Sequence, residues 1–126
     1  MVEYRIDSVQ RLIIVTGDYA TPEEWTALLA RVLADPDRRP GFGYLRDLRS
    51  VTSGVDVATI RQVVAVFRKV WSQLEISRAA LVATAAVDSI AIAQVLATEA
   101  QMPLGAFTSY DAAVEWLRDG LTQPQP

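Results

Sequence analysis

The hydrophobic positions of the chain follow two spacings, one typical of strands and one typical of helices. Short apolar runs at 4–7, 12–16, 44–48, 78–83 and 106–108 predict five strands. Apolar residues recur every three or four positions over 21–35, 56–74, 88–101 and 109–117, which predicts four helices. The order β-β-α-β-α-β-α-β-α predicts an α/β fold, in which a mixed five-stranded sheet with an N-terminal antiparallel hairpin is packed against helices.

Several helix boundaries carry their own signals. Thr21-Pro-Glu-Glu combines an N-cap threonine, a proline in the first turn and a glutamate that can close a capping box. Asp35-Pro36 ends that helix, and Asp56 can cap the long one that follows. Ser109 or Asp111 begins the last helix, which we expect to end near Leu117. We therefore expect one domain over 1–120 and a disordered tail over 121–126.

Composition excludes several classes of function. The 126 residues contain no cysteine and no histidine, which excludes disulfides, cysteine nucleophiles and imidazole-based catalysis or metal binding within this chain. A net charge of −3 argues against nucleic-acid binding. Residues 79–98 are long enough to span a bilayer, but Asp88 stands in their middle, so a buried strand followed by a packed helix explains them better. The charged N-terminal residues do not resemble a signal peptide, and we expect a cytoplasmic protein without cofactors.

Candidate ligand-binding residues follow the strands. The carboxyl ends of parallel strands meet at one sheet edge, where ligands bind in open α/β folds. The segments 17–20, 49–54, 84–89 and 108–111 should meet there. The candidates for contact with a ligand or partner are Asp47, Arg49, Ser50, Ser53, Asp56, Asp88 and Ser89. The alternative is that the polar residues of these loops are helix caps and turns, which favour the same residue types.

Asp47 differs from the other acids because it lies on a predicted strand. Alternation places Leu45 and Asp47 on one face of that strand, and Tyr44, Arg46 and Leu48 on the other. A functional Asp47 would bind a ligand or organise the site. A structural Asp47 would pair with Arg46, Arg49 or Arg61, or accept backbone amide bonds. An enzyme that uses Asp47 remains a minor alternative.

The helix over 56–74 has more apolar residues than one face requires. A stripe wider than a sheet can cover often continues into a partner subunit. A homodimer through this helix and complete burial within the chain both account for it. The residues expected at such an interface are Val63, Val66, Phe67, Val70 and Trp71. The helix over 90–100 is rich in small apolar residues, which favours close packing or an apolar pocket beneath it.

Three segments together resemble a known family. They are Leu12–Gly17 before a helix, Leu45-Arg-Asp-Leu-Arg-Ser-Val, and Phe107-Thr-Ser-Tyr-Asp-Ala-Ala-Val-Glu-Trp-Leu. Their order and spacing over 4–117 are similar to the SpoIIAA-like group, small bacterial domains related to STAS and SEC14-like proteins. The resemblance implies a non-enzymatic regulatory or protein-binding role.

The resemblance also bears on regulation and on ligands. Anti-sigma-factor antagonists of the STAS family carry a phosphorylatable serine where this chain has Val57, so we expect no phosphorylation at that position. The SEC14 side of the resemblance implies a carrier or sensor of a small apolar or lipid-like ligand. This is the alternative to a domain that binds a protein partner.

Overall fold

The strands of the protein form one mixed sheet in the computed structural model, which describes residues 2–17, 21–50, 57–83 and 104–122. The strands are β1 (Val2–Asp7), β2 (Leu12–Gly17), β3 (Gly43–Asp47), β4 (Ala79–Val82) and β5 (Leu104–Phe107). The helices in the described ranges are α1 (Pro22–Ala34), α2 (Val57–Leu74) and α4 (Tyr110–Thr122). The helix predicted over 88–101 lies outside the described residues.

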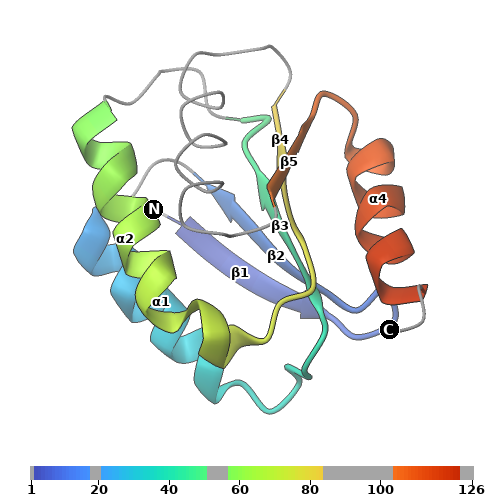
Figure 1. Ribbon diagram of the computed structural model, residues 1–126, viewed down its shortest axis with the longest axis horizontal. Helices are drawn as coiled ribbons and strands as arrows, with labels where there is room; N and C mark the ends of the chain where they lie inside the picture. The colour runs from blue at the N-terminus through green and yellow to red at the C-terminus, as the bar shows by residue number, and fades with distance from the viewer. Residues whose placement is uncertain (1, 18–20, 51–56, 84–103, 123–126) are drawn as a thin grey trace.

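The strands are arranged in chain order, β1-β2-β3-β4-β5. β1 pairs with β2 in antiparallel fashion, and β2, β3, β4 and β5 are mutually parallel. The α/β class, the mixed five-stranded sheet and the N-terminal hairpin predicted from the sequence are therefore confirmed. Figure 1 shows α1 and α2 on one side of this sheet and α4 on the other.

The first helix begins as the sequence predicts. The Thr21 hydroxyl accepts a hydrogen bond from the Glu24 amide at 3.2 Å, and the Glu24 carboxylate accepts one from the Thr21 amide at 3.4 Å. This reciprocal capping box satisfies two amide groups that the first turn of a helix leaves without intrahelical partners. The helix ends at Ala34, and the amide of Asp35 donates to the carbonyl of Val32.

The last helix is longer than expected. Ser109 caps it, because its hydroxyl accepts a hydrogen bond from the Ala112 amide at 3.2 Å. Asp111, the other candidate for the start, lies in the first turn. The helix continues past Leu117 to Thr122, so the first two residues of the expected tail are helical. Residues 123–126 lie outside the described part of the chain.

The sheet is buried on both faces by alternating side chains. Ile13, Val15 and Tyr44 point into a cluster shared with α1 and α2. Leu12, Ile14 and Leu45 point into a second cluster with α4. On β4, Ala79 joins the first cluster and Ala80 the second, so the continuous apolar run of that strand reflects cover on both faces.

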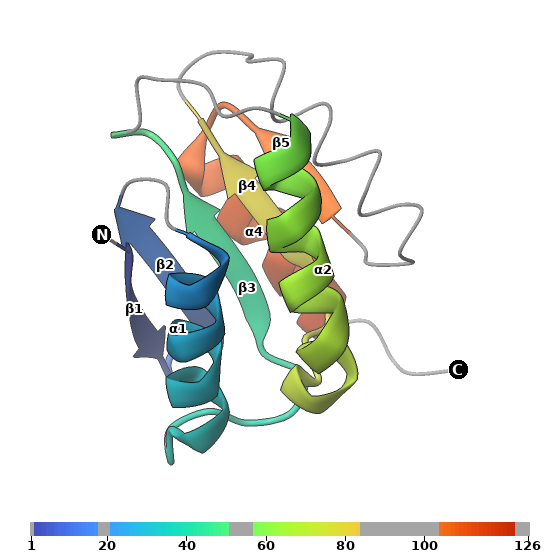
Figure 2. The same cartoon turned by 90° about the vertical axis from the view of Figure 1, so that its left-hand side faces the viewer.

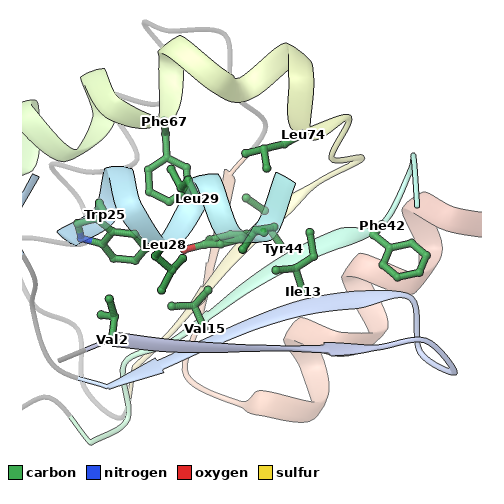
Figure 3. Packing of buried hydrophobic residues seen from close by; sticks show 12 residues of the cluster. Val2, Ile13, Val15, Trp25, Leu28, Leu29, Phe42, Tyr44, Phe67 and Leu74 are labelled. Atoms are coloured by element: carbon green, nitrogen blue, oxygen red, sulfur yellow. The ribbon is translucent and has the colours of Figure 1, made fainter. Parts of the chain in front are cut away.

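Phe67 connects α2 to the rest of the first cluster. Its ring centroid lies 5.2 Å from that of Trp25 on α1 and 5.4 Å from that of Tyr44 on β3 (Figure 3). Half-buried residues of α2 pack against the same cluster, and they include Val63, Val66, Val70 and Trp71. The wide apolar face of α2 is therefore used within the chain, and a dimer through this helix stays a prediction.

Two positions near the start of β3 require glycine, one for its backbone conformation and one for close packing. Gly41 has φ +88°, which side chains other than glycine rarely adopt. A Cβ on Gly43 would lie 3.0 Å from a Leu12 methyl group and 3.3 Å from the Leu117 Cβ. Gly43 therefore lets α4 approach the sheet closely.

The described ranges contain no helix that is both long and apolar enough to span a membrane. The first part of the apolar stretch 79–98 forms β4, which pairs with β3 and β5 inside the sheet.

We predict that Phe67→Ala lowers the free energy of unfolding by about 3–5 kcal/mol, because a buried aromatic side chain is lost. The loss should not depend on protein concentration, since the ring packs within one chain. Urea denaturation at several concentrations tests this, with Arg68→Ala on the exposed face of α2 as the control. A loss seen only at concentrations where the protein associates would instead place Phe67 at an interface.

Candidate functional site

The candidate site lies where β3 ends and α4 begins, at the carboxyl edge of the parallel strands (Figure 1). Asp47 is the last residue of β3, Arg49 follows in the next turn, and Tyr110 is the first residue of α4. Arg49 contacts both Asp47 and Tyr110, and we call the three residues the Asp47–Arg49–Tyr110 cluster. Residues 51–56 and 84–103, which adjoin this edge in sequence, lie outside the described ranges.

Asp47 and Arg49 form a bidentate ion pair. One carboxylate oxygen of Asp47 accepts from Arg49 Nε at 2.9 Å, and the other accepts from Arg49 Nη2 at 2.8 Å. The first oxygen also accepts the backbone amide of Arg49 at 3.0 Å. Of the partners considered from the sequence, Arg49 is therefore the one that Asp47 binds, through side chain and backbone together. Parallel N–H···O bonds of this kind fix the orientation of both groups.

The ion pair sets the charge of the carboxylate. Hydrogen bonding to Arg49 is the main cause that holds the pKa of Asp47 below its ordinary value of 3.8, although partial burial opposes this shift. The same pair raises the pKa of Arg49. Asp47 is thus a stable anion at neutral pH, and its low pKa makes it a weak proton acceptor.

Tyr110 completes the cluster from the other side. The guanidinium carbon of Arg49 lies 4.6 Å from the centre of the Tyr110 ring, a cation–π arrangement. The Arg49 side chain is 46% exposed, whereas that of Asp47 is 14% exposed. A solvent-facing guanidinium is therefore held in one orientation by an acid and an aromatic ring.

Arg46 occupies the opposite face of β3, as alternation predicts. It is the buried charged residue of the described part of the chain, with 4% of its surface exposed. Its guanidinium lies 5.4 Å from the Trp25 ring on α1, and Nη1 approaches the Asp47 carbonyl oxygen at 3.5 Å. The pattern of the sequence is consistent with this contact, since Trp25 lies on the apolar face of the first predicted helix and Arg46 on the Tyr44 side of its strand.

The other predicted site residues are not brought into this cluster. Ser50 lies within the described residues, at the end of the turn after β3, and its side chain is exposed. Ser53, Asp56, Asp88 and Ser89 lie outside the described residues. Val57 is the first residue of α2. Within the described ranges, no group of three or more acidic side chains is arranged to hold a metal ion.

Comparison of the chain with models of protein families, with curated proteins and with solved structures found no match.

We predict that Asp47→Asn lowers the free energy of unfolding at pH 7 by about 1 kcal/mol, because a partly exposed ion pair contributes at that level. A lowered pKa in the folded state stabilises the protein above the unfolded pKa, and this contribution is lost as the pH falls through the folded value. The difference between wild type and variant should therefore be largest above pH 5 and shrink below 3.8, the ordinary pKa of the group.

Urea denaturation at pH 7 and at pH 3 measures this difference. Asp37→Asn is the matched control, since Asp37 is exposed in the turn after α1. An equal loss of stability at both pH values would show that Asp47 does not act through its charge.

Proposed function

We propose that the protein is a non-enzymatic regulatory domain that binds a protein partner, in the manner implied by its resemblance to the SpoIIAA-like group. The observation that carries the proposal is the Asp47–Arg49–Tyr110 cluster. It places an ordered guanidinium and an aromatic ring at the sheet edge where α/β folds bind their ligands.

The electrostatics of the cluster favour binding over catalysis. A general base at neutral pH needs a pKa close to 7. Arg49 instead lowers the pKa of Asp47 below its ordinary value of 3.8. Both oxygens of the carboxylate already accept hydrogen bonds from Arg49. Asp47 is therefore better suited to position Arg49 than to take a proton from a substrate.

The exposed part of the cluster suits a protein surface. Arginine and tyrosine are enriched among the residues that dominate binding energy at protein interfaces. Because Asp47 and Tyr110 already restrain the Arg49 side chain, Arg49 would lose less conformational entropy when a partner binds it. Asp47 also compensates the charge of Arg49, which favours carbonyl and amide groups of a protein over a highly charged phosphate.

The position that corresponds to the family's phosphorylated serine is Val57, at the start of α2. A valine has no hydroxyl group, so binding by this protein would not be switched by phosphorylation there. Regulation, where it exists, would come from the partner or from another residue.

We predict that Arg49→Ala weakens binding of the partner at least tenfold, since truncation of an anchored interface residue costs about 1–2 kcal/mol or more. Tyr110→Ala should have a similar effect, because it removes the ring that restrains Arg49. The experiment captures proteins from a lysate of the source organism with wild type and variants, then measures the affinity of the purified partner by calorimetry. Arg68→Ala, on the exposed face of α2, is the control and should bind as wild type does.

Two outcomes would contradict the proposal. One is a partner whose affinity is unchanged by Arg49→Ala and Tyr110→Ala, although both variants are folded. The other is an apolar small molecule that co-purifies with the protein and is seen by native mass spectrometry. That result would favour the carrier or sensor of a lipid-like ligand.

A further inference from the structure

β1 forms an edge of the sheet. It pairs with β2 through six consecutive residue pairs, from Val2 opposite Gly17 to Asp7 opposite Leu12. Among the described residues, no strand pairs with its other side, and Figure 2 shows β1 at the margin of the sheet. An edge strand has backbone amide and carbonyl groups that can pair with another chain.

β1 lacks two common protections of an edge. It contains no proline, and its regular register with β2 contains no bulge. It does carry a third common protection, charged side chains, at Glu3, Arg5 and Asp7. These three residues alternate in sign along one face of the strand, so the effect of their charge depends on what lies opposite them.

The two faces of β1 differ in chemistry. Val2, Tyr4 and Ile6 pack against the cluster shared with α1 and α2. Glu3 and Arg5 lie on the opposite face and are exposed. Tyr4, in the middle of the strand, is held at the C-terminal end of α1, because its hydroxyl donates to the carboxylate of Asp35, the residue that follows the helix, at 2.8 Å. The strand therefore presents a fixed edge with an apolar and a charged side.

The sequence of β1 is complementary to itself in the antiparallel register that pairs residues 2–6 of both copies. When two copies are related by a two-fold axis at Tyr4, Glu3 of each copy lies opposite Arg5 of the other. On the other face, Val2 lies opposite Ile6. Opposite charges and apolar pairs directly across two antiparallel strands both stabilise the pairing.

The neighbouring registers are unfavourable. Residues directly opposite in an antiparallel ladder must both face the partner with their backbone groups or both face away. In a symmetric pair of β1 strands, the two-fold axis must therefore pass through a residue and not between two residues. The residues next to Tyr4 through which it could pass are Arg5 and Glu3. An axis at Arg5 places the two Arg5 side chains opposite each other and Glu3 opposite Asp7. An axis at Glu3 places two Glu3 carboxylates together. An axis at Ile6 would place Arg5 opposite Asp7, but only residues 5–7 of the two strands would then overlap. The axis at Tyr4 therefore joins opposite charges over the longest overlap of the two strands.

We propose that β1 pairs with β1 of a second copy of this chain, antiparallel and centred on Tyr4, so that two sheets join into one continuous sheet. Each copy would contribute the same surface, as a two-fold interface requires. The proposal does not depend on the Asp47–Arg49–Tyr110 cluster, which belongs to the carboxyl edge of β3 rather than to β1. It also differs from a dimer through α2, because Val63, Val66, Val70 and Trp71 would remain outside the interface.

The test uses two single charge reversals. In Glu3→Lys, the introduced lysine would lie opposite Arg5 of the second copy, and in Arg5→Glu two carboxylates would face each other. Each variant alone should dimerise about tenfold or more weakly than wild type, because two symmetric pairs become repulsive. An equimolar mixture of the two variants should restore association, since each new pair then joins opposite charges.

Sedimentation velocity over a range reaching high micromolar concentrations measures this association. Glu115→Lys on α4 and Arg68→Glu on α2 are the charge-matched controls and should dimerise as wild type does. Circular dichroism checks that every variant is folded, as expected for changes at exposed side chains. In wild type, amide hydrogen exchange in residues 2–7 should slow as the concentration rises.

Three results would overturn the proposal. A wild type that is monomeric throughout the concentration range would do so. So would a dimer that both single reversals leave intact. The third is a dimer that Val66→Lys abolishes while Glu3→Lys and Arg5→Glu do not, which would place the interface on α2.

Discussion

The structure depends on the burial of the parallel strands on both faces at once. Leu45 and Tyr44 are neighbours on β3, yet Leu45 packs against the α4 cluster and Tyr44 against α1 and α2. Because successive side chains of a strand point to opposite faces, each residue of β3 is assigned to one helical layer or the other. On one face, Phe67 of α2 packs against both α1 and the sheet. On the other face, the missing side chain of Gly43 lets α4 lie close to the sheet. The positions of Arg46 and Asp47 at the end of β3 follow from the same alternation between the two faces.

The same alternation separates the two arginines near the end of β3. Arg46 is directed towards Trp25 and buried, whereas Asp47 is directed to the other face and binds Arg49, which in turn lies over the ring of Tyr110. The two guanidinium groups therefore have different roles. Arg46 stacks on an aromatic ring inside the protein, and Arg49 is held at the surface with part of its side chain in solvent. Asp47 holds Arg49 in one orientation through two hydrogen bonds, and our proposal of a binding role rests on this ordered surface.

The two candidate contact surfaces use different physical properties of the sheet. The carboxyl edge of β3 offers side chains that are ordered by one another, and its specificity would come from Arg49 and Tyr110. The β1 edge offers backbone groups, and its specificity would come from the order of charges along the strand. Both proposed surfaces lie where the helices do not cover the sheet, one at its carboxyl edge and the other at the edge strand β1.

Much of the fold follows from local rules that the sequence carries. The capping box at Thr21, the hairpin, the five strands and the alternation on β3 are confirmed, because each depends on residues that are close in the chain. The helix α4 is longer than predicted, because it continues through Gly120, a residue type that often ends helices, to Thr122. The pairing of Asp47 with Arg49 is local, but the sequence left Arg46 and Arg61 open as alternatives. Tertiary structure alone decided that Tyr110 covers Arg49 and that Phe67 packs inside the chain. Periodicity states which face of an element is apolar, but not which distant element covers it, because that choice depends on contacts between residues far apart in sequence.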